Sequence, residues 1–347
     1  MAPKIFLSRL GYIGGAVFAQ VHDTHPDYDF TLFVRNEERS KPIAAKYPNV
    51  KFLYGTLDDS TVIEKAAAEA DVVIHTADSS DNVPAANAIA KGLAAGHTAE
   101  KPGYCIHLSG TGILTWYDFE QRRYGEGPLP EQKYNDLEGI EQVLNLPDHA
   151  SHRNVDKIVQ AANSDAVKAL IVAPPCIYGT GRGTVNTRSI QVPNLARVTL
   201  RQGYAPIVGA GATEWDNVHI DDLADLFGKF VDASQDPAKR DNPEIFGRKG
   251  YFFARQDFHK WSDVATWIAE EVSRKGYLPE PKTKSVTQKE VAATGLFAAP
   301  SWGANSKGEA ERAKKYLGWD PRAPVLKDTI SEAVEIEAKA LGLTGKA

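Results

Sequence analysis

The chain has few cysteines and no long apolar run. Only Cys105 and Cys176 occur among its 347 residues. Both lie in short apolar stretches, and we interpret them as small core residues in a reducing compartment rather than as a disulfide. No apolar run approaches the roughly 20 residues needed to cross a bilayer, and none near the N-terminus has the length of a signal peptide. We therefore expect a cytoplasmic protein with no membrane partner.

The chain also has no excess of basic charge. The chain has 40 Lys and Arg against 45 Asp and Glu, a net charge of -5, which excludes the basic excess of a general nucleic-acid binder. The 42% hydrophobic and 24% charged content is typical of a soluble globular protein. The length fits one large α/β domain, or a core domain with a smaller one. We expect no metal site.

The N-terminal segment carries the strongest pattern. An apolar run at 5–7 predicts a buried strand, Gly11 and Gly14 follow in a turn, and apolar residues at helical spacing over 13–18 predict a helix. This strand, glycine turn and helix form the opening unit of a dinucleotide-binding domain. There, backbone N–H groups and the positive end of the helix dipole meet a pyrophosphate.

The turn resembles that of the short-chain dehydrogenase/reductase superfamily, in its extended and atypical branches, where it reads Gly-x-x-Gly-x-x-Gly. Here Ser8 stands at the first glycine and Arg9 follows it. Two alternatives remain open. The segment can be an ordinary strand–turn–helix that binds no ligand, or Arg9 can change the phosphate site, either by blocking the turn or by pairing with a phosphate. The resemblance implies these cofactor-binding residues in the turn: Ser8, Arg9, Gly11, Tyr12, Ile13 and Gly14.

The second predicted strand, Phe30–Val34, ends at Arg35. In dinucleotide-binding domains an acidic residue at this place binds the ribose 2′-hydroxyl, whereas an arginine accommodates a 2′-phosphate. Arg39 and Lys41 follow closely. The sequence therefore favours NADP(H) over NAD(H), with a solvated basic cluster as the alternative.

Further cofactor contacts follow from the resemblance. Leu57 and Asp58 come after the third predicted strand, beside the adenine, although the neighbouring Asp59 can equally be only a helix N-cap. Thr76 and Ala77 end the fourth predicted strand, against the ribose and pyrophosphate. Pro174 and Ile177 belong to a Pro-Pro-x-x-Tyr-Gly turn at 174–179, which in extended members covers the nicotinamide.

The superfamily's active-site helix carries Tyr-x-x-x-Lys, with both side chains on one face, one turn apart. Lys157 matches the lysine, which by the resemblance holds the nicotinamide ribose. Arg153 occupies the position of the tyrosine that, in the superfamily, exchanges the proton with the substrate. His152 is the nearest acid or base, yet on a helix it points about 100° away from that face.

Several consequences of this departure stay open. Arg153 can stabilise an oxyanion as a fixed positive charge, or Tyr117 can supply the proton from another direction. Alternatively, the protein binds the nucleotide as a sensor without hydride transfer. A purely structural interpretation is a surface Arg153 paired with Asp156 on the same helix.

Ser109 and Thr111 follow the fifth predicted strand, where the superfamily places a hydroxyl that bonds the substrate's reacting oxygen. Both can equally be turn residues. The segment 114–146 is long and aromatic, as functional lids and binding loops often are. We expect these residues to contact substrate: Trp116, Tyr117, Tyr178, Arg188 and Trp215.

Two later motifs extend the resemblance over nearly the whole chain. Val-His-Ile-Asp-Asp-Leu-Ala at 218–224 is similar to a segment of extended members in which His219 is mostly structural and Asp222 caps a helix. Leu-Gly-Trp-Asp-Pro at 317–321 matches the segment before the last helix of the family.

Together these patterns predict an α/β protein with a Rossmann-type, doubly wound parallel sheet. Residues 1–175 form the dinucleotide-binding domain. Residues 176–347 form mainly a smaller substrate-binding subdomain, with one late strand at about 244–254 returning to the sheet. The resemblance implies an NADP(H)-linked oxidoreductase acting on a small carbonyl or alcohol. A homodimer is compatible with the resemblance. The alternative is a non-catalytic NAD(P)-binding regulator of the fungal nitrogen-metabolite-repression type.

Overall fold

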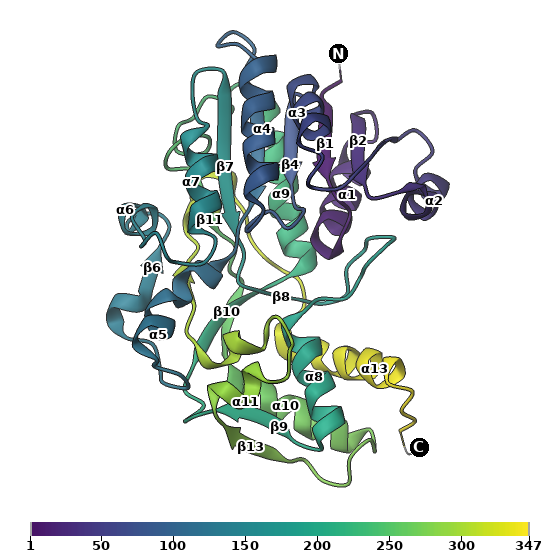
Figure 1. Ribbon diagram of the computed structural model, residues 1–347, viewed down its shortest axis with the longest axis vertical. Coiled ribbons are helices and arrows are strands. Elements are labelled where there is room, and N and C mark those ends of the chain that lie inside the picture. The colour runs from purple at the N-terminus through teal and green to yellow at the C-terminus, as the bar shows by residue number, and fades with distance from the viewer. Residues whose placement is uncertain (1, 346–347) are drawn as a thin grey trace.

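The computed structural model describes residues 2–345, and a seven-stranded sheet forms its centre (Figure 1). The strand order is β3-β2-β1-β4-β5-β7-β11, and every neighbouring pair is parallel. The predicted doubly wound Rossmann-type fold is confirmed. The strands up to β3 are added on one side of β1, and those from β4 onward are added on its other side, so the strand order reverses between β1 and β4. In such sheets ligands bind at the carboxyl ends of the strands beside that point. The strands are β1 (Lys4–Ser8), β2 (Asp29–Val34), β3 (Lys51–Tyr54), β4 (Val72–His75), β5 (Gly103–Leu108), β7 (Val167–Ala173) and β11 (Tyr251–Phe253).

Helices cover both faces of this sheet. On one face, Phe18 and Val21 of α1 and Phe227 and Phe230 of α9 pack into one apolar core. On the other face, the small apolar residues of α3 and α4, with Val159 of α7, form a second core. Because parallel strands are buried on both faces, both cores are needed to shield the sheet. The helices are α1 (Tyr12–Thr24), α2 (Glu37–Lys46), α3 (Ser60–Glu69), α4 (Val83–Gly96), α7 (Arg153–Ala161), α9 (Ile220–Gln235) and α12 (Arg312–Leu317).

A second lobe lies below the sheet in the view of Figure 1. Three tryptophans, Trp215, Trp261 and Trp302, lie in its core. Its strands are β8 (Cys176–Tyr178), β10 (Glu214–His219) and β12 (Asp257–Lys260) in one sheet, and β9 (Ala205–Val208) with β13 (Thr283–Val286) in another. Its helices are α8 (Gln191–Gln202), α10 (Trp261–Arg274), α11 (Gln288–Ala292), η3 (Ala299–Gly303), η4 (Leu326–Thr329) and α13 (Ile330–Ala340).

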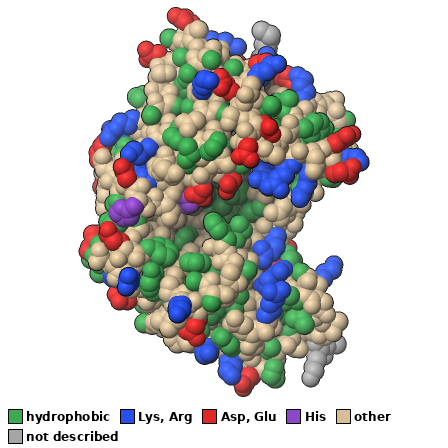
Figure 2. Space-filling view, viewed as in Figure 1, with side chains coloured by type: hydrophobic (Ala, Val, Ile, Leu, Met, Phe, Trp, Pro, Cys, Tyr) green, Lys and Arg blue, Asp and Glu red, His purple; other side chains and the backbone are tan. Residues whose placement is uncertain are grey.

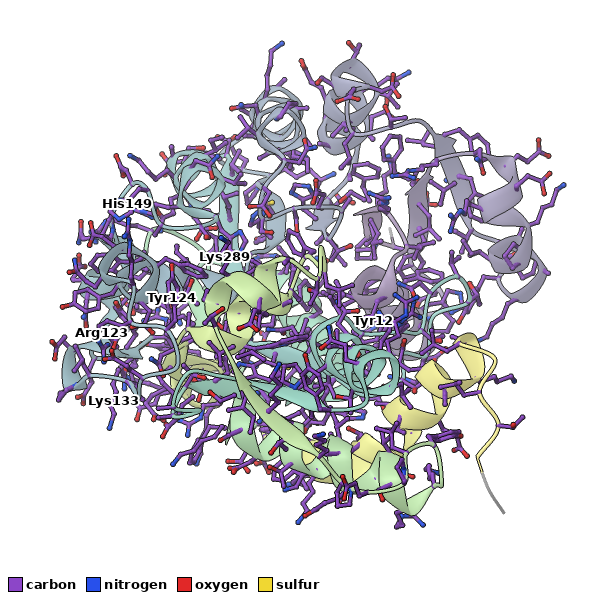
Figure 3. The ribbon with its side chains drawn as sticks, turned by 60° about the horizontal axis from the view of Figure 1, so that its bottom comes forward. Tyr12, Arg123, Tyr124, Lys133, His149 and Lys289 are labelled. Atoms are coloured by element: carbon purple, nitrogen blue, oxygen red, sulfur yellow. The ribbon has the colours of Figure 1, made fainter. Side chains whose placement is uncertain are left out.

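The aromatic segment between β5 and α7 is folded and anchored. Its buried Asp118 accepts hydrogen bonds from Arg123, Gln132 and Asn305. Figure 3 shows Arg123, Tyr124, Lys133 and His149 together on one side of the molecule, far from Tyr12. The segment contains η1 (Thr111–Thr115), α5 (Trp116–Gln121), η2 (Pro130–Gln132), β6 (Lys133–Asn135) and α6 (Ile140–Leu144), and β6 pairs with β14 (Lys307–Glu309).

Two local predictions need correction. The late strand is only Tyr251–Phe253, because the chain at 244–250 forms turns before it reaches the sheet edge beside β7. Asp222 does not cap α9; His219 does, through a bond from the Asp221 N–H to its Nδ1. The Asp222 carboxylate instead accepts hydrogen bonds from the backbone N–H groups of Arg322 and Ala323.

Both cysteines are buried and free, as predicted. Among residues 2–345, no helix combines the length and apolarity required to span a bilayer. The same part of the chain holds no group of three or more His, Cys, Asp or Glu side chains placed to bind a metal ion.

Candidate functional site

Two adjoining pockets lie over the carboxyl ends of β1, β2 and β4, and we call them together the turn pocket. Figure 2 shows the cleft between the two lobes, with basic side chains on one part of its upper rim and acidic ones beside them. The two pockets share Arg9, Val34 and Arg35. The other lining residues are Leu10, Gly11, Arg39, Val185 and Asn186 on one side and Phe33, Gly55, Thr56, Leu57, Asp58, Asp78 and Asn82 on the other.

The substituted glycine turn is closed by Ser8 and Thr76. Ser8 stays in β1, and its hydroxyl donates to the Ile74 carbonyl (3.4 Å) and accepts the Thr76 N–H (3.3 Å). The left-handed conformation falls one residue later, on Arg9, with φ at 77°. A serine is thus accommodated at the first glycine position because the residue after it makes the turn.

The two remaining glycines have different roles. A Cβ on Gly14 would lie 2.2 Å from the Arg9 carbonyl oxygen, so only glycine allows α1 to approach the turn. A Cβ on Gly11 would meet no protein atom within 4 Å. Gly11 therefore borders open space at the start of α1, where a ligand can approach the backbone.

The N-terminus of α1 is suited to an anion. Gly11 is its N-cap, no side chain caps it, and no acidic residue lies in the first turn of this 13-residue helix. Its first N–H groups therefore have no intrahelical acceptor, and the helix dipole adds partial positive charge at the same place. These are the two features by which helix N-termini bind phosphates.

Three arginines add full positive charge to the turn pocket. Burial, and next the positive charge of Arg35, lower the pKa of Arg9, with Arg39 acting in the same direction and Asp78 opposing it. Between residues 2 and 345, no ion pair or side-chain hydrogen bond engages the guanidinium of Arg9, Arg35 or Arg39. Guanidinium groups this close repel one another, and a multiply charged phosphate relieves that repulsion.

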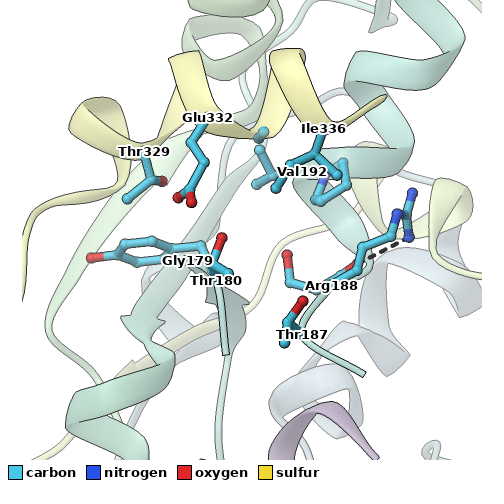
Figure 4. A pocket seen from close by; sticks show the side chains of 12 residues that line it. Gly179, Thr180, Thr187, Arg188, Val192, Thr329, Glu332 and Ile336 are labelled. Carbon is cyan, nitrogen blue, oxygen red and sulfur yellow. Dashed lines mark hydrogen bonds between the residues drawn. The ribbon is translucent and has the colours of Figure 1, made fainter. Parts of the chain in front are cut away.

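A second pocket lies between the loop after β8, α8 and α13 (Figure 4). Tyr178 and Arg188 line it, as do Thr180, Glu332 and Ile336. The Arg188 guanidinium donates to Glu337 (2.5 Å) and Asn194 (2.9 Å). The Tyr178 hydroxyl donates to Gln256 and Pro324. Both polar groups are therefore bound by the protein itself.

A histidine lies at the same edge of the sheet as the turn pocket. His152 is the N-cap of α7, with φ at 69°, and does not belong to the helix. Its Nδ1 lies 2.8 Å from Oδ1 of Asp81, in the turn before α4. Helical periodicity does not apply to a residue outside the helix, so the angle of about 100° expected between His152 and the active-site face does not describe its position.

Comparisons with known proteins agree with this geometry. A family model described as NAD(P)H-binding matches residues 10–175. The oxidase ucsJ from an Acremonium species is 35% identical over 354 residues, covering 99% of this chain and all of that protein. The chain therefore belongs to the same family as this Acremonium protein, and its N-terminal part is of the NAD(P)H-binding type.

Solved structures share the fold. The dTDP-glucose 4,6-dehydratase DesIV from Streptomyces venezuelae has a TM-score of 0.67 at 13% identity, covering 98% of each chain. The UDP-glucose 4-epimerase of Thermotoga maritima has a TM-score of 0.62 at 16% identity, covering 97% of this chain and 99% of that one. At such identities the likeness concerns the fold alone.

Several predicted cofactor residues lie in or beside the turn pocket of this NAD(P)H-binding protein. Leu57, Asp58 and Arg35 line it directly. Thr76 supports the turn through its hydroxyl, which donates to the Arg9 carbonyl (3.2 Å), and Ala77 is buried behind it.

Two other predicted cofactor residues join the lobes. The Tyr12 hydroxyl donates to the carbonyls of Tyr178 (3.1 Å) and Gly179 (2.7 Å). Ile13 packs with Ile177 against the same small cluster. Pro174, in the turn before β8, accepts the Thr111 N–H with its carbonyl.

Lys157 and Arg153 do not line the turn pocket. The Lys157 ammonium contacts both carboxylate oxygens of Asp148 (2.9 and 3.0 Å), and its side chain is 49% exposed. Arg153 is buried and donates to the Leu144 carbonyl (2.6 Å) and to Gln160 (3.1 Å). The side chain at the tyrosine position therefore points toward the end of α6. The surface Arg153–Asp156 pair considered from the sequence does not form.

The two hydroxyl candidates are both buried. Thr111 Oγ1 accepts a bond from Ser306 (2.8 Å), so a protein group already uses it. Ser109 lies beside Asp156 and Tyr251, whose hydroxyl donates to Asp156 (2.9 Å). Burial raises the pKa of Asp156 to about 6, against the lowering effect of the two hydroxyls.

Among the predicted substrate residues, Trp215 is a core residue. It is 4% exposed, its indole N–H donates to the Ala304 carbonyl (2.6 Å), and it packs on Trp261. The prediction that Trp215 faces substrate is wrong, because β10 directs it into the second lobe. Trp116 donates to the Tyr134 hydroxyl (3.0 Å), and Tyr117 packs edge-on against Trp116.

His152 is a potential acid or base whose position the sequence did not predict. Its sequence signal was only its place one residue before Arg153. The left-handed backbone that brings the ring to the edge of the sheet has no sequence pattern of its own.

Proposed function

We propose that this protein is an NADP(H)-linked oxidoreductase acting on a small carbonyl or alcohol. The observation that carries the proposal is the group of Arg9, Arg35 and Arg39 around the turn pocket. A 2′-phosphate distinguishes NADP(H) from NAD(H), and an arginine at the end of β2 is the residue type that accommodates it.

The residues of the turn pocket fit this cofactor. The uncapped N-terminus of α1 would hold the pyrophosphate, and Arg9 would add a charge-assisted contact beside it. Arg35 and Arg39 would bind the 2′-phosphate, with Leu57 beside the adenine. When bound, the nicotinamide supplies or accepts hydride. The relative from Acremonium is named an oxidase, which supports redox chemistry.

A second candidate function is that of a nucleotide-binding regulator without turnover. The burial of Arg153 and the outward position of Lys157 favour it. Arg153 stands in place of the usual tyrosine, and the Lys157 ammonium is paired with Asp148. The two candidates share the cofactor site and differ in whether bound NADPH is ever oxidised.

The first test is titration of the purified protein with NADPH and NADH, read by calorimetry or nucleotide fluorescence. We expect Arg35→Ala to weaken NADPH binding about 10- to 100-fold, because one charge-assisted bond to a phosphate contributes about 1.5–3 kcal/mol. NADH binding should change little, since NADH has no 2′-phosphate.

The control variant is Arg201→Ala, which removes an exposed arginine of α8 in the second lobe. It should leave both affinities unchanged. Equal losses of NADPH and NADH affinity in Arg35→Ala would contradict the assignment of the 2′-phosphate. Oxidation of NADPH over a panel of carbonyl compounds then separates the enzyme from the regulator.

A further inference from the structure

Left-handed backbone gathers at the carboxyl edge of the sheet. Among residues 2–345, four non-glycine residues have positive φ, and three of them are Arg9, Asp78 and His152. Arg9 and Asp78 line the turn pocket. Non-glycine residues in this conformation are strained, and such strain gathers at functional sites. His152 belongs to the same edge.

One turn connects the turn pocket with His152. Asp78 and Asn82 line the pocket, and the Asp78 carbonyl accepts the N–H groups of Asp81 (3.1 Å) and Asn82 (2.9 Å). Asp81 therefore has a fixed backbone position, and its carboxylate bonds His152 Nδ1. The hydrogen bond from His152 is the main cause that lowers the pKa of Asp81. An ionised Asp81 accepts the Nδ1–H and leaves Nε2 as the reactive nitrogen.

The Nε2 atom lies over the glycine loop after β5. A Cβ on Gly112 would come within 3.0 Å of it and crowd the ring, whereas one on Gly110, at 3.5 Å, would make an ordinary contact. The next residue in this loop, Thr111, bonds the Pro174 carbonyl, which ties it to the turn before β8. The His152 side chain remains 17% exposed. Within the described chain, Nε2 has no hydrogen-bond partner.

We propose that His152 is the catalytic acid and base of this protein and that Asp81 is its positioning residue. The proposal rests on the proposed NADP(H)-linked function and names the group that replaces the absent tyrosine. The substrate class is a carbonyl compound whose oxygen reaches Nε2 from the cleft.

The proton balance is simple. In reduction, the carbonyl carbon would gain a hydride from bound NADPH, leaving NADP⁺. The carbonyl oxygen takes the proton from the Nε2–H of the imidazolium, so an O–H bond forms as the N–H bond breaks. The neutral ring then regains a proton from water. Asp81 stays ionised throughout and holds the ring in one orientation, as the carboxylate does in other His–Asp pairs.

Other titratable groups face this histidine. Besides Asp81, these are Asp156 of α7 and His107 of β5, both of which interact with its charge. Asp156 is bound by Tyr251, and His107 is fully buried. Of this group, His152 combines partial exposure with a free ring nitrogen.

The experiment compares His152→Gln and Asp81→Asn with the wild type in NADPH titration and in single-turnover NADPH oxidation over the carbonyl panel. We expect His152→Gln to keep NADPH affinity within about 3-fold and to slow oxidation by about 100-fold or more, the usual contribution of a positioned acid or base. Asp81→Asn should cause a smaller fall. The matched control is His25→Gln, a second His–Asp pair (2.6 Å to Asp232) at the C-terminal end of α1.

A spectroscopic measurement tests the pair without turnover. Nitrogen-15 spectra of the neutral imidazole should show the Nδ1–H tautomer for His152 in the wild type and a mixture in Asp81→Asn. An Nε2–H tautomer in the wild type, or a His152→Gln rate within 3-fold of the wild type, overturns the assignment of His152. Failure of the wild type to bind NADPH overturns the proposed function instead. Binding without oxidation of any carbonyl overturns both proposals and favours the regulator.

Discussion

Arg153 shows how a single side chain can occupy the place of a catalytic residue and take a different role. Its guanidinium donates hydrogen bonds to the last carbonyl of α6 and to Gln160, two turns further along the same face of α7. A buried arginine with two such bonds contributes to stability, because removing it leaves the Leu144 carbonyl unsatisfied. The position therefore links α7 to α6 rather than to the cleft.

Restoring the family's tyrosine should consequently fail to create an active site. We expect Arg153→Tyr to lower the free energy of unfolding by about 2 kcal/mol, measured with urea. NADPH affinity and turnover should not rise. Asn154→Tyr, at the neighbouring exposed position of α7, controls for the added ring. A gain in NADPH oxidation specific to Arg153→Tyr would show that position 153 reaches the substrate.

At the scale of elements, α13 is held on α8 by one buried carboxylate. Glu337 is fully buried, and its carboxylate accepts hydrogen bonds from the Nε atoms of Arg188 and Arg197, each at 2.5 Å. Around it, Val334 and Ala338 pack into the core of the second lobe. Because the same Arg188 lines the pocket of Figure 4, the contact that docks the last helix also shapes that pocket.

Neutralising this carboxylate should loosen the helix. We expect Glu337→Gln to lower the free energy of unfolding by about 3 kcal/mol, since two arginines would lose their shared buried partner. The matched variant is Glu335→Gln on the same helix, whose exposed carboxylate lies 3.4 Å from Lys275. Its effect should be below about 1 kcal/mol. Equal effects of the two variants would contradict the role of burial.

At the scale of the whole molecule, two buried histidines determine part of the pH dependence of the free energy of unfolding. His75 of β4 and His107 of β5 face each other with their Nδ1 atoms 3.1 Å apart, beneath α4. Burial lowers the pKa of His75 to about 3, and burial followed by the neighbouring His75 lowers that of His107. Both rings are neutral when the chain is folded, whereas the unfolded chain protonates them below pH about 6.5.

Stability should therefore fall as the pH falls below about 6.5. Between pH 7.5 and 5.5 the two histidines together account for a loss of about 2.5 kcal/mol. Replacing both by leucine, which has a similar volume, should remove that part of the pH dependence with little change at pH 7.5. Urea unfolding at both pH values measures it, with the exposed His149→Leu as control. An unchanged pH dependence in the double variant would mean that the pair is not neutral when folded.

Local patterns in the chain predicted the sheet and the cofactor turn. The alternation of apolar runs with helical spacing sets the strand and helix identities, because burial of each apolar face is a local property of the segment. The glycine turn and the arginine after β2 predicted residues that line one pocket, since the carboxyl ends of parallel strands converge.

Contacts between distant segments decided the rest. Whether Arg153, Lys157 or Trp215 faces the cleft depends on which neighbour satisfies it, and Leu144, Asp148 and Ala304 do so. The position of His152 depends on where α7 begins and on the carboxylate of Asp81, 71 residues earlier. Sequence alone determined that a dinucleotide-binding sheet forms. Only the tertiary structure decided which acid or base stands at its edge, because that choice follows from a long-range hydrogen bond and one left-handed residue.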